Sequence, residues 1–237
     1  MANPFSSQAP DAALTNALLQ YSDWYVMRDV LIPADDRTMH IDFVIASPQC
    51  IFLGEYKTYQ GIIAGSGMNK YWKQYVGGAE IDYFSPVMQS LYHMLQMRKF
   101  LSPVPYELHF HSLVVMQPVG RGGRLELTGP YPADTSIVQN LNAMRRIVQL
   151  VCEKRKMHLT EAETQYIYDY IGEHQLRGED MRRKHAAESA DYKLNARRAL
   201  AQQICPECLS PLKPVGTPTG NYWVCSRYPD CKYTHKM

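Results

Sequence analysis

Three charged residues near the start of the chain have the types and spacing of a metal-dependent hydrolytic site. Twelve residues separate Asp42 from Glu55, and a single residue separates Glu55 from Lys57. Carboxylates are ligands that Mg²⁺ and Mn²⁺ prefer, and a bound metal lowers the pKa of its water. A lysine beside the metal can orient that water or stabilise developing negative charge. Together the three side chains have the groups that phosphodiester hydrolysis requires.

A β-hairpin would bring these charges together. Two apolar runs, 41–46 and 50–56, are separated by the turn residues 47–49. If the turn is centred between Pro48 and Gln49, the numbers of paired residues sum to 97 and Asp42 lies opposite Glu55. Lys57 then follows Glu55 on the same face, because side chains alternate along a strand. Two opposed carboxylates repel each other, and a divalent cation would relieve that repulsion.

The alternative is an exposed face with cross-strand salt bridges. Against it, both faces of the hairpin are apolar: Val44, Ala46, Ile51 and Leu53 share the face of the charges, and Phe43, Ile45 and Phe52 occupy the other. We therefore expect the hairpin to be covered on both sides and its charges to lie in a partly buried cleft.

The order Asp, twelve residues, Glu-x-Lys resembles the PD-(D/E)xK nuclease superfamily, and further residues resemble its NERD, or nuclease-related, domain. These residues are Ile41-Asp42, Ser47-Pro48, Glu55-Tyr-Lys57-x-Tyr59-x-Gly61, Tyr71-Trp72 and Ser85-Pro86-Val-Met-Gln89. The resemblance covers about residues 8–120 and implies a restriction-endonuclease-like α/β fold, with a mixed sheet flanked by helices.

The resemblance also implies roles for individual residues. Asp42 and Glu55 would bind Mg²⁺ or Mn²⁺, Lys57 would act on the water, and Gln89 would assist from a helix. Asp11 stands where the family usually has a glutamate, so a shorter side chain would have to reach the metal or its water shell. His93 lies one helical turn after Gln89 and faces the same way, so it could assist as well, but we favour a position on the helix surface.

Four cysteines near the C-terminus have the spacing of a zinc ribbon. Cys205 and Cys208 form one close pair, and Cys225 and Cys231 form another. Four thiolates match tetrahedral Zn²⁺, and so small a segment needs the metal to fold. The zinc is expected to be structural.

This segment resembles the C-terminal zinc finger of bacterial type I topoisomerases. The matching residues are Cys205-Pro-x-Cys208, Pro211-Leu212 and Gly220-Asn-Tyr-Trp-Val-Cys225-Ser-x-Tyr-Pro-x-Cys231-x-Tyr-Thr234, with Leu209 in place of a usual glycine. The resemblance implies binding of single-stranded DNA. Stacking and phosphate contacts would come from Tyr222, Trp223, Tyr228, Tyr233, Arg227 and Lys232. About half of the aromatic residues are expected to form the small core instead.

The composition is that of a chain that folds around a hydrophobic core. Of the 237 residues 46% are hydrophobic, and the net charge of +2 gives no strong overall field. The N-terminus lacks the pattern of a signal peptide and no apolar run reaches the length of a membrane span, so we expect a cytoplasmic protein. We divide the chain into a nuclease-like domain (1–174), a charged helical linker (175–203) and the ribbon (204–237).

The remaining patterns predict the elements around the hairpin. Strands are expected at 24–32 and 108–116, and helices at about 137–154 and 161–174. Ser85-Pro86 begins a helix to about residue 100. Its apolar stripe would be Val87, Leu91, Met94 and Leu95, and its polar stripe Gln89, His93 and Gln96.

Three functions fit these patterns. The first is a metal-dependent nuclease that acts on DNA and whose zinc ribbon binds the nucleic acid. The second is a non-catalytic nucleic-acid-binding accessory protein that retains the nuclease fold. The feature that supports this alternative is Asp11, an aspartate in place of the family's usual glutamate. The third is a zinc-stabilised module for protein interaction.

Overall fold

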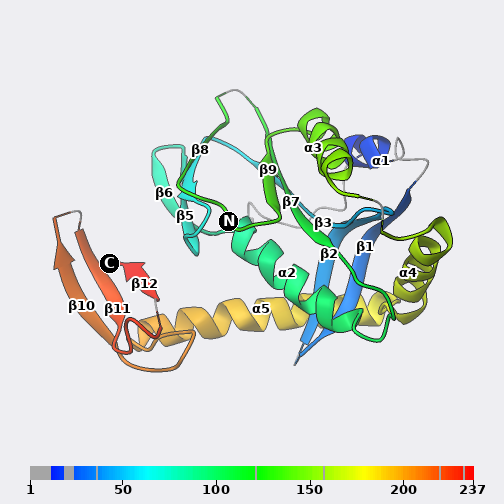
Figure 1. The fold of residues 1–237 in the computed structure, drawn as a ribbon. Helices are drawn as coiled ribbons and strands as arrows, with labels where there is room; N and C mark the ends of the chain where they lie inside the picture. The colour runs from blue at the N-terminus through cyan, green and yellow to red at the C-terminus, as the bar shows by residue number, and fades with distance from the viewer. Residues whose placement is uncertain are drawn as a thin grey trace. The chain divides into compact units, whose positions relative to one another are not determined.

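The chain forms two compact units, Met1–Arg177 and Gly178–Met237 (Figure 1). A computed structural model describes residues 12–18, 24–35, 37–120, 122–156, 158–218, 220–231 and 233–237. The boundaries that we expect at residues 174 and 203 remain predictions, and each unit is described separately.

A mixed five-stranded sheet forms the centre of the first unit. Its strand order is β1-β2-β3-β7-β9. The strands are β1 (Tyr25–Ala34), β2 (Arg37–Ala46), β3 (Ile51–Tyr59), β7 (Phe110–Pro118) and β9 (Thr135–Val138). The pairs β1–β2 and β2–β3 are antiparallel, whereas β3–β7 and β7–β9 are parallel. The predicted α/β class with a mixed sheet flanked by helices is confirmed.

Helices cover both faces of this sheet. They are α1 (Ala12–Leu18), α2 (Pro86–Phe100), α3 (Leu141–Lys154) and α4 (Glu161–His174). On one face α2 and α4 pack on Val44, Ile51 and Leu53. On the other face α1 and α3 pack on Phe43, Ile45 and Phe52. The expectation that the hairpin is covered on both sides is therefore confirmed, because its apolar residues divide between two cores as alternation along the strands requires.

A second sheet extends from the first. Its strands are β4 (Ile62–Ser66), β5 (Tyr71–Val76), β6 (Ala79–Phe84) and β8 (Arg124–Thr128), in the order β6-β5-β4-β8. Its core contains Ile63, Trp72 and Tyr83, packed with Val87 of α2 and Met116 of β7. Helix α2 thus contacts both sheets, which fixes its N-terminal half beside β3.

The second unit consists of a long helix and a small sheet. Helix α5 (Glu179–Ala201) precedes the strands β10 (Leu212–Thr217), β11 (Gly220–Cys225) and β12 (Thr234–Lys236). The three strands form an antiparallel sheet in the order β10-β11-β12. Among the described residues, no helix is both long and apolar enough to cross a membrane.

Helix α2 begins as predicted but presents a different face to the core. Ser85 is its N-cap, and its Oγ accepts a hydrogen bond from the Met88 N–H. Leu95 of the expected apolar stripe is 51% exposed, whereas His93 and Gln96 of the expected polar stripe are buried. That part of the prediction is wrong, because these polar side chains meet partners on the sheet side: Glu55 and Asp35.

The region from residue 135 to 140 also differs from expectation. Residues Thr135–Val138 form β9, and the predicted helix begins only at Leu141. The Asn140 Oδ1 caps it by accepting a hydrogen bond from Ala143 N–H at 2.8 Å. This strand adds a parallel neighbour to β7, with Leu113 opposite Ser136.

Candidate active site

The β2–β3 hairpin has the register that the sequence predicts, up to the point where the charges begin. The pairs from Ala46–Ile51 to Phe43–Gly54 all sum to 97. In this register the next residue pair is Asp42 and Glu55. The β2–β3 backbone pairing ends before this pair. Instead, the Tyr56 backbone N–H donates a hydrogen bond to the Asp42 side chain, with Oδ2 2.6 Å away. The strands therefore hold the Asp42 carboxylate with a main-chain donor from β3.

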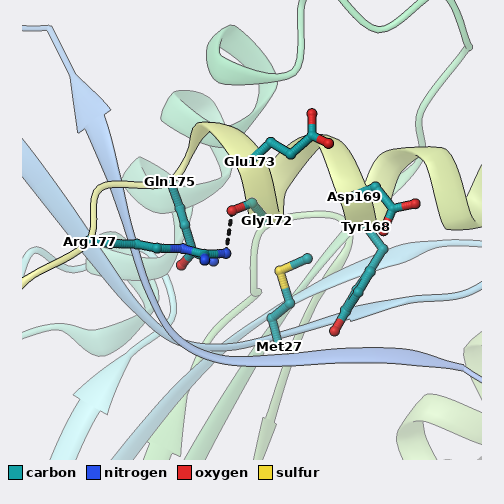
Figure 2. A pocket seen from close by; sticks show the side chains of 7 residues that line it. All are labelled: Met27, Tyr168, Asp169, Gly172, Glu173, Gln175 and Arg177. Carbon is teal, nitrogen blue, oxygen red and sulfur yellow. Dashed lines mark hydrogen bonds between the residues drawn. The ribbon is translucent and has the colours of Figure 1, made fainter.

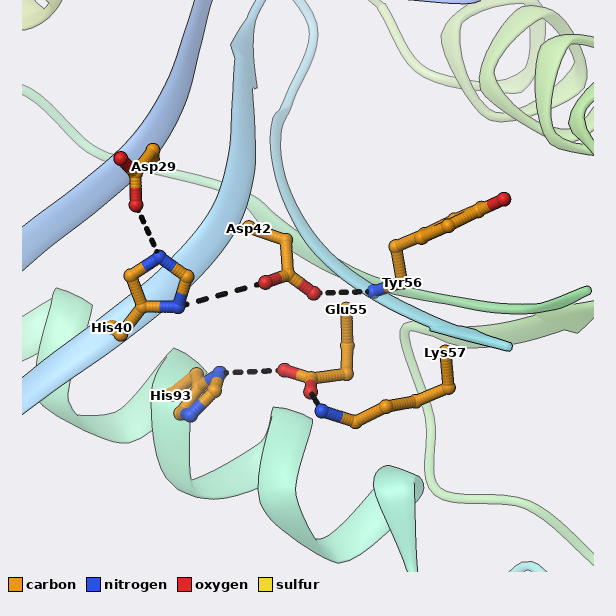
Figure 3. Close-up of polar contacts among 7 residues, drawn as sticks. All are labelled: Asp29, His40, Asp42, Glu55, Tyr56, Lys57 and His93. Atoms are coloured by element: carbon orange, nitrogen blue, oxygen red, sulfur yellow. Dashed lines mark hydrogen bonds and ion pairs between the residues drawn. The ribbon is translucent and has the colours of Figure 1, made fainter. Parts of the chain in front are cut away.

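Glu55 lies at the centre of a group of contacting side chains (Figure 3). Its carboxylate is only 2% exposed. One oxygen, Oε1, forms an ion pair with Lys57 Nζ, and the other, Oε2, is 3.3 Å from Nδ1 of His93. A buried carboxylate is costly unless it is paired and hydrogen-bonded, and both conditions are met here.

His93 belongs to this group, which corrects its expected place on the helix surface. It is 6% exposed and projects from α2 towards Glu55 (Figure 3). Ser90, on the same helix, also contacts the sheet, because its Oγ forms a hydrogen bond with Ser112 Oγ of β7 in the core. The one-turn spacing of Gln89 and His93 was the available sequence signal, and the sequence alone could not show that this face of α2 meets β3.

Asp42 is also buried, at 8% exposure. Burial, and next the negative charge of Glu55, raises its pKa above the ordinary value of 3.8, against the lowering effects of Lys57, the Tyr56 N–H and His40. The two carboxylates are therefore close enough to repel each other. This is the arrangement that a bound cation would stabilise.

Lys57 remains charged in this setting. Burial alone would lower its pKa, but the charges of Glu55 and Asp42 outweigh that effect and raise the pKa above 10.5. Its ammonium is thus available to stabilise negative charge rather than to accept a proton.

A histidine that the sequence analysis did not select contacts Asp42. His40 precedes Asp42 by two residues on β2, so both side chains lie on the same face. Its Nδ1 is 3.5 Å from Asp42 Oδ1, and its Nε2 is 2.6 Å from Asp29 Oδ1 on β1 (Figure 3). Its i, i+2 spacing from Asp42 was the signal that could have identified it.

The donor groups of this site fit a divalent cation of the Mg²⁺ or Mn²⁺ type. Two buried carboxylates, Asp42 and Glu55, face the same side of the hairpin, and burial first, then the negative charge of Glu55, raises the pKa of Asp42. Among the described residues, three or more potential ligand atoms within 4.8 Å of one another occur at the terminal cysteines alone. A cation between the carboxylates would therefore complete its shell with water and phosphate oxygens, as Mg²⁺ commonly does.

The other two residues of the predicted catalytic set are not part of this contact group. Gln89 lies in the first turn of α2 and is half-buried. In the part of the chain that the structure describes, no hydrogen bond joins its side chain to Asp42, Glu55 or Lys57. Asp11 lies outside the described residues. Their predicted roles remain predictions.

The four terminal cysteines converge as predicted. The Sγ atoms of Cys205, Cys208, Cys225 and Cys231 all lie within 4.8 Å of one another. Hydrogen bonding to Ser210 is the main cause that lowers the pKa of Cys208 to about 6, whereas burial raises the pKa of Cys205 and of Cys225. Metal binding would therefore have to draw the proton from the latter two thiols. Cys50 and Cys152 lie buried in the first unit and do not join this cluster. The cluster fits a small zinc ribbon.

The aromatic residues of the ribbon have different surroundings. Tyr228 is 60% exposed, and Tyr222 and Trp223 are half-buried. Tyr233 is only 4% exposed because it packs with Cys205 and Cys225, so its ring belongs to the small core and offers no exposed stacking surface. Arg227 is exposed, and Lys232 lies outside the described residues.

A separate pocket of about 380 Å³ lies between β1 and the C-terminal end of α4 (Figure 2). It is lined by Met27, Tyr168, Asp169, Gly172, Glu173, Gln175 and Arg177. The Arg177 guanidinium donates to the Gly172 carbonyl across it. None of the hairpin charges lines this pocket, so it is separate from the candidate active site.

The comparison with protein families agrees with this geometry. Asp42, Glu55 and Lys57 all lie on the β2–β3 hairpin of the mixed sheet. Residues 10–117 match the family model described as NERD, nuclease-related domain. That match indicates a nuclease-like or nucleic-acid-related function. No curated protein and no solved structure matches the chain.

Proposed function

We propose that the protein is a metal-dependent nuclease that hydrolyses DNA phosphodiester bonds. The observation that carries the proposal is that buried Asp42 and Glu55 lie with half-buried Lys57 on one hairpin, within the residues that match the nuclease-related domain. Structural ion pairs seldom place two carboxylates that repel each other inside a core. In a cation-binding site, by contrast, the bound ion neutralises the two carboxylates and so accounts for their burial side by side.

The chain's own residues perform most of the chemistry. Asp42 and Glu55 would hold Mg²⁺ or Mn²⁺, which when bound lowers the pKa of a water molecule and neutralises charge on the phosphate. Tyr56 N–H fixes one oxygen of Asp42, and His93 fixes one oxygen of Glu55. The Lys57 ammonium stabilises the negative charge that develops as water attacks the phosphorus in line with the leaving oxygen.

We propose that the zinc ribbon binds single-stranded DNA. The cysteine cluster would hold a structural Zn²⁺, and a reducing cytoplasm would keep its thiols available. Tyr228 presents an exposed ring on which a base can stack, next to the exposed Arg227, which can contact a phosphate. Trp223 offers a smaller, half-buried surface.

A non-catalytic accessory protein is the second candidate. The Lys57–Glu55 ion pair supports it, since a lysine that neutralises a buried carboxylate can serve the fold without any metal. In this case the protein binds DNA without turnover. A module for protein interaction alone differs from both, because its affinity for DNA would be negligible and would show no steep dependence on salt.

Cleavage of plasmid and single-stranded DNA with Mg²⁺, Mn²⁺ or EDTA tests the proposal. We expect the wild type to cleave with metal and not in EDTA, and Glu55→Ala to lose cleavage. Glu173→Ala is a matched control, because Glu173 is an exposed acid on α4. Equal cleavage by all three proteins would refute the site. DNA binding without cleavage by the wild type would favour the accessory protein.

A further inference from the structure

Leu209 of the zinc ribbon has a backbone conformation that suits glycine. Its φ is +57°, in the left-handed region where the Cβ of an L-amino acid crowds the following carbonyl oxygen. The Leu209 N–H donates to the Cys205 carbonyl at 2.9 Å, and the Cys205 N–H donates to the Ser210 carbonyl at 2.8 Å. These hydrogen bonds close the turn and impose the conformation. Glycine, which has no Cβ, would adopt it without this crowding.

The side chain of Leu209 does not pack in the fold either. It is 75% exposed, the largest value for any large apolar side chain among the described residues. The small core of the ribbon is built from other residues. A leucine that neither packs nor suits its backbone lowers the stability of the ribbon. Strained positions of this kind occur preferentially at functional sites.

A second exposed side chain, Tyr228, lies on the other cysteine turn. Its ring is 60% exposed, and its N–H donates to the Cys225 carbonyl at 3.1 Å. The Sγ atoms of Cys225 and Cys208 are 3.3 Å apart, and Leu209 directly follows Cys208. Leu209 and Tyr228 therefore extend from two turns around one group of sulfur atoms. Arg227, also exposed, adds a positive charge beside Tyr228.

We propose that this end of the ribbon recognises the junction between single-stranded and double-stranded DNA, with Leu209 packed on the last base pair of the duplex. An exposed ring stacks on unpaired bases, and an arginine contacts phosphates. An aliphatic wedge such as leucine instead inserts at the base steps of a duplex. The inference rests on the proposed function, because it names the DNA structure that the ribbon would bind.

The surroundings of Leu209 favour DNA over a protein partner. Its sequence neighbours Cys208 and Ser210 are half-buried, so the leucine projects as a single side chain from the turn. The core of a protein interface is a contiguous, well-packed patch of many residues. A single projecting leucine is suited to the narrow step at the end of a duplex.

Binding to three labelled DNAs tests the inference: a single strand, a blunt duplex, and a duplex with a single-stranded overhang. The zinc-loaded full-length protein is titrated at one salt concentration, without added Mg²⁺ or Mn²⁺. We expect the wild type to bind the overhang duplex about tenfold more tightly than either of the other DNAs, since a leucine side chain leaves water at the junction.

Leu209→Gly should lose this preference and bind the single strand as the wild type does. It should also retain zinc at least as well as the wild type against a competing chelator, because glycine suits a positive φ. A purely structural role for Leu209 would not combine retained zinc with lost junction binding. Leu209→Met, which keeps an apolar side chain, should keep the preference. Val215→Ala is the matched control, because Val215 is an exposed apolar residue of β10 outside the cysteine turns.

The outcomes separate this inference from the proposed function. Equal binding of the overhang duplex by the wild type and Leu209→Gly would overturn the inference and would leave Leu209 for a protein contact. A wild type that binds the single strand without preferring the overhang duplex would also overturn it, but the proposed single-strand binding would stand. A wild type that binds none of the three DNAs would overturn both.

Discussion

At the scale of residues, the site is defined by how each carboxylate is held. Glu55 has a partner on each oxygen: Lys57 from its own strand and His93 from α2. Asp42 is held by a main-chain N–H and faces His40. The sequence shows the charges and their spacing, but the partners come from separate elements.

His93 is expected to position Glu55 rather than to touch the substrate. His93→Ala should lower the rate of metal-dependent DNA cleavage about tenfold without weakening DNA binding, because Glu55 loses the group that orients it. His93→Gln, which retains an N–H donor, should recover part of the rate. Single-turnover cleavage and DNA titration check this, with His174→Ala on the exposed end of α4 as a control. A rate unchanged in His93→Ala would refute this role.

Asp42 should destabilise the metal-free fold at neutral pH. Since burial and Glu55 raise its pKa above 3.8, the folded state favours the protonated form, and stability is lost as pH rises from about 4 through the raised pKa. Asp42→Asn keeps an acceptor for Tyr56 N–H without the charge. In EDTA its Tm should exceed that of the wild type by a few degrees at pH 7, about 1 kcal/mol in a domain of this size. The difference should vanish near pH 4. Thermal unfolding at both pH values measures it, and a lower Tm for Asp42→Asn at pH 7 would contradict the expected repulsion.

At the scale of elements, the hairpin was predictable and the helix face was not. The register of β2 and β3 follows from the turn residues and from two-sided apolar alternation, both of which are local. The buried face of α2 depends on Glu55 and Asp35, which come from other elements. Polar residues at helical spacing look solvated in the sequence, and their burial becomes evident only with these partners in place.

Strand β9 was missed for a similar reason. Residues Thr135–Val138 form a short segment whose partner, β7, is distant in sequence. A pattern of four residues cannot distinguish a strand from the start of a helix. His40 was overlooked because its contact with Asp29, a residue of β1, is formed only in the folded chain.

Gly54 is required for the hairpin to hold its register next to the charges. It pairs with Phe43, and a Cβ at position 54 would lie 2.1 Å from Cζ of the Phe43 ring. Gly54→Ala should therefore destabilise the protein by about 1–3 kcal/mol, as overpacked cores do. Denaturant unfolding measures the effect. Gly77→Ala is the control for backbone strain alone, because Gly77 has a positive φ but a Cβ added there would have nothing within 4 Å. Wild-type stability of Gly54→Ala would show that the ring can move aside.

At the scale of the whole molecule, the two units have different sources of stability. The first has cores on both faces of a sheet, whereas the core of the ribbon consists of a few residues around four cysteines. A core that small needs a metal ion to fold. The ribbon was predictable from cysteine spacing alone, but which of its tyrosines is buried was not.

Zinc removal should unfold the ribbon and leave the first unit folded. We expect a single Zn²⁺ per chain, lost in Cys225→Ser and retained in Cys152→Ser, whose cysteine is buried in the first unit. Metal analysis measures the zinc, and limited proteolysis locates the unfolded segment. Equal zinc content in the two variants would contradict the assignment of the cysteine cluster.

The central claim is that Lys57 and its two carboxylates hydrolyse DNA, and the cleavage rate of Lys57→Ala tests it most directly. With Mn²⁺ present, its rate should fall at least about a hundredfold below that of the wild type, since the developing charge loses its ammonium. DNA binding should persist. Lys99→Ala, which removes an exposed lysine paired with Asp35, should cleave at the wild-type rate. Equal rates for Lys57→Ala and the wild type would contradict the account.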